Sequence, residues 1–250
     1  MTTRIHAVTF DFWNTLYSAD SGSMDEVWPL RFSVLHDLLN DAGVQVTNGD
    51  LERARESSFH AYMAAWHGGS HFGAPEHVRH VLAFFGAAAP EDAVAEASVK
   101  IEQSTLCVRL KPLPGVLEAI PALASAGYRL GVISDTSLTP GRLLQTYLKD
   151  DGLLEYFSAL TFSDETGFPK PDVRMFGRTL AALGVAPAEA AHVGDMPRTD
   201  IAGAKALGML AIRYAGAMDV EEPPAADFVI GDHRELPGLL TRLEEQPGEA

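Results

Sequence analysis

The chain has 250 residues, 46% of them hydrophobic, so it is long enough to bury the core of one large domain or of two modest ones. A formal net charge of −15 argues against nucleic acid and anionic membrane as its main partners. With a single cysteine it has no intrachain disulfide, and no apolar run is long enough to span a bilayer, so we expect a cytoplasmic enzyme or binding protein, as a monomer or homodimer.

The segment from Ile5 to Phe10 is rich in apolar β-formers and predicts a buried strand. Asp11 follows directly, and Asn14 and Thr15 offer backbone and hydroxyl donors beside it. A carboxylate at the end of a buried strand is costly unless something pairs with it, and the carboxyl ends of parallel strands are where α/β sheets place ligands. On this segment alone, an Asp that caps a turn is the simpler interpretation.

Residues 18–110 show a helical pattern wherever they are regular. Apolar residues recur at helical spacing from Asp25 to Asn40, Asp50 is a candidate cap for a second helix, and further helices are expected at about 76–85 and 90–108. No strand pattern interrupts this block, so we expect it to form an all-helical domain.

From Lys111 onward, strand patterns alternate with helical patterns. Strands are expected at 129–134, 158–162, 190–194, 210–213 and 227–230, and helices at 116–126, 140–149, 171–183, 199–207 and from about 235. This alternation is typical of βαβ units and a mostly parallel sheet. The first strand belongs with them, so we expect a doubly wound α/β core made of residues 1–17 and 111–250, interrupted by the helical domain 18–110.

Polar side chains of particular types follow four of the expected strands. They are Asp11; Ser134 with Asp135 and Thr136; Lys170, between two prolines; and Asp195 with Asp200. A doubly wound sheet brings such ends together at one edge. Three carboxylates would repel one another without a cation, and hard oxygen ligands suit Mg²⁺, while an ammonium and a hydroxyl are suited to hold an anion beside it. This set predicts phosphoryl transfer through an aspartyl-phosphate.

Each of these residues also has an ordinary structural interpretation. Ser134 and the pair Asp195 and Asp200 are suited to cap helices, and a lysine such as Lys170 is usually solvated. Four such coincidences, in this order and at four strand ends, are much less expected than one.

The ordered set DFWNTL, VISDT, KPD and VGDMPRTDIAGAKALGM resembles the four motifs of the haloacid dehalogenase (HAD) superfamily of hydrolases. The resemblance covers residues 4–17 and 111–243, and the helical block matches, in position and character, the cap domain that many members insert after the first motif. It implies a Rossmann-like core with Asp11 as nucleophile and Mg²⁺ ligand. It further implies that Asp195 and the backbone carbonyl of Trp13 are Mg²⁺ ligands too.

By the same resemblance, Asp200 supports either the metal or Lys170, and Ser134 and Lys170 bind the phosphoryl oxygens of a small phosphorylated substrate. Further candidate contacts to the substrate are Trp13, Asn14, Thr15, Asp135, Thr136 and Arg142.

The sequence departs from the family pattern at Trp13. Phosphatases of the superfamily usually have a second Asp here, which protonates the leaving group and later activates water. Indole donates one hydrogen bond but does not exchange a proton usefully. Either the substrate has a good leaving group, another residue supplies the proton, or activity is weak. A second departure is Asp135, where the family often has Asn.

In having an aromatic residue at the position of Trp13, the chain resembles the 2-haloacid dehalogenases, which need no metal. The intact pair Asp195 and Asp200 argues against that chemistry. A metal-independent dehalogenase and a catalytically weak HAD-fold binding protein are therefore the alternatives to a Mg²⁺-dependent phosphatase. In the helical block, Trp28 and Arg31 are candidates to face an active site, and five histidines are candidate acids or bases, although packing and solvation are the commoner fates: His60, His67, His71, His77 and His80.

Overall fold

The computed structural model describes residues 4–20 and 22–245, and the chain divides into two compact units. The first unit comprises residues 4–18, 110–135 and 144–245 and contains the main sheet. The second comprises residues 19–109 and 136–143. The sequence pattern did not separate 136–143 from the sheet unit. This segment groups with the helices because Leu138 packs against their apolar core and Thr139 bonds to Thr105.

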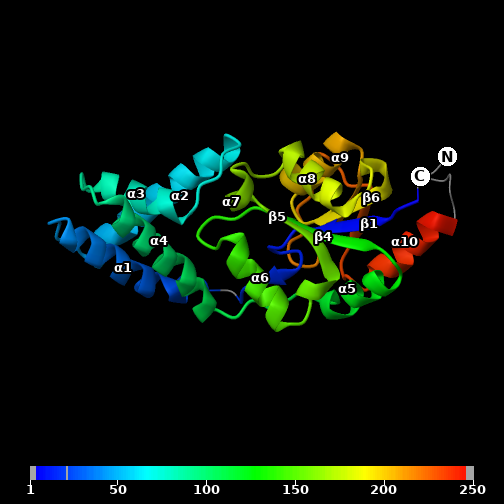
Figure 1. Cartoon of the computed structure of the whole chain (residues 1–250), viewed down its shortest axis with the longest axis horizontal. Coiled ribbons are helices and arrows are strands. Elements are labelled where there is room, and N and C mark those ends of the chain that lie inside the picture. Colours follow the sequence, from blue (N-terminus) through cyan, green and yellow to red (C-terminus); the bar gives the residue numbers. More distant parts are fainter. Residues whose placement is uncertain (1–3, 21, 246–250) are drawn as a thin grey trace. The chain divides into compact units, whose positions relative to one another are not determined.

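A parallel sheet of six strands lies at the centre of the first unit, in the order β5-β4-β1-β6-β7-β8 (Figure 1). The strands are β1 (Ala7–Phe10), β4 (Arg129–Ser134), β5 (Phe157–Phe162), β6 (Ala190–Gly194), β7 (Leu210–Tyr214) and β8 (Phe228–Ile230). The chain runs outward from β1 through β4 and β5, then crosses to β6 on the other side of β1. The predicted α/β fold is therefore confirmed, and its topological switch point, where such sheets bind ligands, lies beside β1.

Helices cover both faces of this sheet, which is why its central strands are buried throughout. On one face α8 (Val173–Leu183) and α9 (Ala202–Leu207) pack their apolar side chains onto alternate strand residues such as Ala7 and Ala190. On the other, α5 (Val116–Ser125) packs on β4, and α10 (Glu235–Glu245) packs on α5 (Figure 1). Shorter elements complete the connections: α6 (Gly141–Asp150), α7 (Ser163–Thr166), η3 (Leu154–Tyr156), η4 (Pro187–Glu189) and the π-helical turn η5 (Pro197–Ile201).

The second unit is helical in its regular parts. Its elements are η1 (Asp25–Val27), α1 (Trp28–Asp41), α2 (Asn48–His67), α3 (Ala74–Phe84), α4 (Glu91–Ser104) and η2 (Thr105–Cys107). Its core is built from one buried stripe of each long helix, with Leu39, Leu51, Val78 and Ile101 as members. Within the described part of 26–108 there is no strand, as the periodicity predicted.

The start of α2 corrects one expectation. Asp50 is not its N-cap. Thr47 is, because its hydroxyl accepts the Asp50 N–H while the Asp50 carboxylate accepts the Thr47 N–H at 2.8 Å. This reciprocal capping box satisfies two backbone donors at once.

A short antiparallel pair, β2 (Tyr17–Ser18) with β3 (Lys111–Pro112), joins the two chain segments that border the helical block. Two residues per strand are too few for a periodicity signal, so the sequence pattern did not predict it. None of the helices in the described ranges combines the length and apolar character needed to cross a bilayer.

Candidate active site

The ends of two neighbouring strands, β1 and β6, bring the predicted acidic residues together. Asp11 directly follows β1 and Asp195 directly follows β6, while Asp200 lies on the turn η5. One carboxylate oxygen of each lies within 4.8 Å of the others, and all three side chains are buried. The convergence inferred from chain order is therefore present in the fold.

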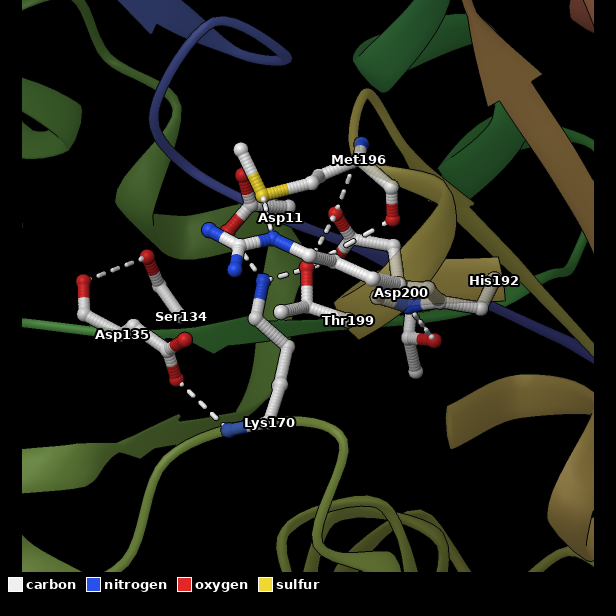
Figure 2. Close-up of polar contacts among 10 residues, drawn as sticks. Asp11, Ser134, Asp135, Lys170, His192, Met196, Thr199 and Asp200 are labelled. Atoms are coloured by element: carbon white, nitrogen blue, oxygen red, sulfur yellow. Dashed lines mark hydrogen bonds and ion pairs between the residues drawn. The ribbon is translucent and has the colours of Figure 1, made fainter. Parts of the chain in front are cut away.

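Lys170 lies between two of these carboxylates. It comes from the loop between α7 and α8, and its side chain is only 3% exposed. Nζ donates to Oδ1 of Asp11 at 2.5 Å and to Oδ1 of Asp200 at 2.7 Å (Figure 2). Its backbone N–H donates to Oδ1 of Asp135 at 2.8 Å. Asp135, predicted from the sequence as a substrate contact, therefore holds the loop that presents the ammonium.

Asp200 has both carboxylate oxygens occupied by protein donors. Oδ1 accepts from Lys170 and lies 3.1 Å from Nε2 of His192. Oδ2 accepts the Met196 N–H at 3.1 Å and lies 3.4 Å from the Thr199 hydroxyl. The wide turn of η5 makes this possible, since it directs the Asp200 side chain back toward the end of β6. The sequence left open whether Asp200 supports the metal or Lys170, and this arrangement favours Lys170.

His192 is a site residue that the sequence analysis missed. It is fully buried in β6, with Nδ1 2.9 Å from the hydroxyl of Thr9. Burial lowers the pKa of His192, so the ring is neutral. Because an ionised Asp200 only accepts hydrogen bonds, Nε2 must hold the proton and Nδ1 accepts from Thr9. The available signal was a polar ring in the interior of a buried strand. It lies two residues before Gly194 and therefore on the same face of the strand as Gly194.

Buried negative charge exceeds positive charge here. Burial raises the pKa of Asp11 well above its ordinary value, although Lys170 opposes this. Burial and the Asp200 charge raise the pKa of Asp195 to about 7, with a hydrogen bond from Asn14 acting against them. Burial also acts to raise the pKa of Asp200, but Lys170 and His192 outweigh it and the net shift is downward. For Lys170 itself, burial acts to lower the pKa, but the carboxylates of Asp11 and Asp200 raise it overall.

The ligand atoms in this cluster fit a hard divalent cation, since they are carboxylate oxygens with too little positive charge around them. The backbone carbonyl of Trp13 accepts no hydrogen bond from the residues that the structure describes, so its oxygen is available to a ligand. The carboxylate groups of Asp11 and Asp195 also keep oxygen lone pairs that could bind such a cation.

The turn between β1 and β2 holds the remaining predicted residues of the first motif. Asn14 adopts a left-handed conformation, with φ of 55°, and donates its N–H to the Tyr17 carbonyl at 2.8 Å. Thr15 is buried, and its carbonyl lies 2.7 Å from Nε2 of His233. Ser134, at the end of β4, is buried and donates to the Asp135 carbonyl at 3.2 Å.

A family model described as haloacid dehalogenase-like hydrolase matches residues 5–208. The chain belongs to this hydrolase family. It is 28% identical over 246 residues to the glyceraldehyde 3-phosphate phosphatase of Methanopyrus kandleri, covering 96% of this chain and 98% of that one.

Solved structures agree with the HAD assignment. A 2-haloacid dehalogenase from Pseudomonas syringae pv. Tomato DC3000 superposes with a TM-score of 0.66 at 25% identity, over 95% of this chain and 99% of that one. A HAD phosphatase from Thermococcus onnurineus shares the fold, with a TM-score of 0.62 at 24% identity over 94% and 98% of the two chains. The resemblance inferred from the four motifs is therefore confirmed.

Two candidate substrate contacts of this HAD hydrolase fall in the second unit. Thr136 is buried there, and Arg142 is an exposed residue whose guanidinium pairs with Glu102 of α4. Their contact with a substrate stays a prediction.

Two histidines of the helical unit, His77 and His80, lie beside serine hydroxyls. His77 lies 2.7 Å from the Ser58 hydroxyl and 3.0 Å from that of Ser137, and burial together with nearby Arg31 lowers its pKa to about 3. Among the described residues, the three aspartates are the one group of acids, histidines and cysteines arranged to hold a metal, so these histidines form no such site.

Gly194 allows Asp200 to reach its position. A Cβ at residue 194 would lie 2.3 Å from Cγ of Asp200. We expect Gly194→Ala to lower the free energy of unfolding by about 1–3 kcal/mol, as overpacking does, and to reduce activity because Lys170 loses its anchor. Gly177→Ala is the matched control, since nothing lies within 4 Å of its added methyl. Urea unfolding that shows equal stability for both variants would contradict this role.

Proposed function

We propose that this HAD hydrolase is a Mg²⁺-dependent phosphatase that acts on small phosphorylated molecules through an aspartyl-phosphate on Asp11. We further propose that the helical block 18–110 is its cap domain. The observation that supports the reaction most directly is the buried ammonium of Lys170, bonded to Asp11 within a cluster of three carboxylates. The Methanopyrus kandleri relative, whose name specifies a three-carbon phosphate ester, supports the same substrate class.

Asp11 is oriented for attack on phosphorus. Its Oδ1 accepts from Lys170, and Oδ2 accepts no hydrogen bond from a described residue, so Oδ2 is the nucleophilic oxygen. Attack forms the bond from Oδ2 to phosphorus and breaks the bond to the leaving oxygen. Water then attacks phosphorus and breaks the bond to Oδ2, which releases phosphate and restores the carboxylate.

Lys170 and Ser134 are placed to stabilise negative charge on the phosphoryl oxygens, one as an ammonium and the other as a hydroxyl. Asp200 and His192 keep Lys170 in position, and Asp135 fixes its backbone. A Mg²⁺ ion would be held by Asp11, Asp195 and the Trp13 carbonyl, and would supply further charge neutralisation at the transferring group.

The test is a screen of small alkyl, aryl and acyl phosphates with Mg²⁺ and with EDTA. Phosphate release should need Mg²⁺ and should disappear in Asp11→Asn. Mass spectrometry of protein quenched during turnover should show a phosphoryl group on Asp11. Hydrolysis by Asp11→Asn at the wild-type rate would exclude the proposed nucleophile.

One alternative has a specific observation in its favour. Trp13 places an aromatic side chain two residues after Asp11, and the Pseudomonas syringae structure is named a 2-haloacid dehalogenase. A metal-independent dehalogenase would release halide from a 2-haloacid in EDTA and would leave phosphate esters intact. Ligand binding without turnover of either substrate class would instead indicate a binding protein.

Asp195→Asn tests the cation site by stability. Because the pKa of Asp195 is raised from 3.8 to about 7, the native state keeps a proton that the unfolded state loses, and the free energy of unfolding falls as pH rises between those values. At pH 8 without metal, Asp195→Asn should therefore melt at a higher temperature than wild type. It should also lose the rise in melting temperature that Mg²⁺ gives the wild type. An equal Mg²⁺ effect in both proteins, with exposed Asp41→Asn as control, would contradict this assignment.

A further inference from the structure

Arg31 is a buried cation without a carboxylate partner. Three lysine or arginine side chains are buried among the described residues: Arg31, Lys170 and Arg213. Lys170 has its two aspartates, and Arg213 pairs with Asp219 at 2.6 Å. Arg31, on α1 of the helical unit and 3% exposed, makes no ion pair within the part of the chain that the structure describes.

Neutral groups hold the guanidinium in place. Nε donates to the Ser104 hydroxyl at 3.1 Å and Nη2 donates to the Thr105 hydroxyl at 3.0 Å. Ser104 and Thr105 belong to α4 and η2, and α4 packs against α1 (Figure 1). The guanidinium carbon lies 5.0 Å from the ring centre of Trp28. Two of its five N–H groups are therefore bonded, and three have no acceptor among the described residues, both of those on Nη1 included.

Other basic groups lie near Arg31, although the Arg55 guanidinium has its own partner in Glu52, at 2.7 Å. The guanidinium of Arg55 lies 4.8 Å from the same Trp28 ring, and the charge of Arg31 helps to lower the pKa of His77. Burial lowers the pKa of Arg31 only to about 10, so it stays charged at neutral pH. A buried ion without a counter-charge is unfavourable, and one end of this guanidinium is left with free donors in a planar fork, which is the geometry that binds carboxylate or phosphate.

We propose that Arg31 forms an oxyanion site within the helical unit, which takes one carboxylate or phosphate group on the free N–H groups of Nη1 and Nη2. Ser104 and Thr105 orient the guanidinium, and the Thr139 hydroxyl, 3.1 Å from that of Thr105, extends this hydrogen-bonded support. The occupant comes from one of two sources, a free anion or an anionic group on the substrate, and the two arms of the experiment separate them.

The first arm measures free anion binding and does not depend on catalysis. Malonate is titrated into the wild-type protein while the Arg31 Nε–H signal is followed by NMR, assigned by its absence in Arg31→Met. That signal should shift, and malonate should raise the melting temperature of wild type but not of Arg31→Met. Arg55→Met is the matched control: it removes a charge over the same Trp28 ring but leaves the buried site, so it should still respond to malonate.

The second arm rests on the proposed phosphatase function. It compares kcat/KM for phosphoglycolate with that for ethyl phosphate, which lacks the carboxylate. If the substrate supplies the anion, Arg31→Met should reduce the ratio by about 10–100-fold, as loss of a charged hydrogen bond does, and Arg55→Met should not. If wild type hydrolyses neither ester, the phosphatase proposal fails while the malonate titration still decides the site.

An unshifted Arg31 signal with malonate, together with an unchanged ratio of the two esters, would overturn the proposal. So would an equal effect of Arg55→Met in both arms. Should Arg31→Met fail to fold, Arg31→Lys keeps the charge but loses the fork, and it should bind malonate more weakly than wild type.

Discussion

Replacing Trp13 by Asp is expected to raise kcat/KM for alkyl phosphates by up to about 10²–10⁴-fold, the range of general acid–base catalysis. Trp13 lies two residues after Asp11 and packs edge-on against Phe12, with ring centres 5.4 Å apart. Its indole protonates no leaving group, so an alkoxide leaves slowly, whereas a phenolate or carboxylate leaves without a proton. The wild type should therefore prefer aryl and acyl phosphates.

The measurement is kcat/KM for a matched alkyl and aryl phosphate with wild type, Trp13→Asp and Trp13→Asn. The Asn variant controls for loss of the indole, because it has a similar shape to Asp but no exchangeable acid proton. The gain is expected to fall short of the full range, since loss of the ring leaves a cavity beside Phe12. Equal wild-type rates on both substrates would show that another residue already supplies the proton.

Lys170→Met is expected to give the second large effect. The substitution leaves the buried carboxylates of Asp11 and Asp200 without their ammonium, and breaking a buried ion pair costs about 3–5 kcal/mol of stability. Activity should fall by at least about 10²–10³-fold, the loss for one stabilising group at a transition state. Lys100→Met, which breaks the exposed pair with Glu96, should leave the free energy of unfolding almost unchanged.

The loss of stability in Lys170→Met should depend on pH with a defined sign. Without the ammonium, the native pKa of Asp11 rises further above its unfolded value, so the native state binds more protons than the unfolded state. The free energy of unfolding then falls as pH rises through that interval, and the variant should be relatively more stable at pH 5 than at pH 8. Urea unfolding at both values measures this, and a deficit independent of pH would argue against the ion pairs as its cause.

Much of the fold was predictable because its signals are local. The strands 129–134 and 190–194 begin and end as expected, since each is a short apolar run between turn residues. The convergence of Asp11, Asp195 and Asp200 was also predictable, because parallel strands share one carboxyl edge. Only the order of elements along the chain was needed.

The unpredicted features depend on contacts between distant segments. The four donors around Asp200 follow from a π-helical turn, which has no sequence signature of its own. His192 is identified as a site residue only once its ring is seen between Thr9 and Asp200. The association of 136–143 with the helices likewise depends on Leu138 finding an apolar core formed far earlier in the sequence.

The central place of β1 in the sheet has a consequence for biosynthesis. Strand β1 leaves the ribosome first, yet one of its two neighbours is β6, about 180 residues later. At about 5–20 residues per second of synthesis, β1 waits on the order of ten to several tens of seconds for that partner. During this interval α1 to α4 already have mostly local contacts available. The newborn chain thus passes through a period in which a strand that is fully buried in the folded sheet has one edge unpaired, and this is when protection by a chaperone would matter most.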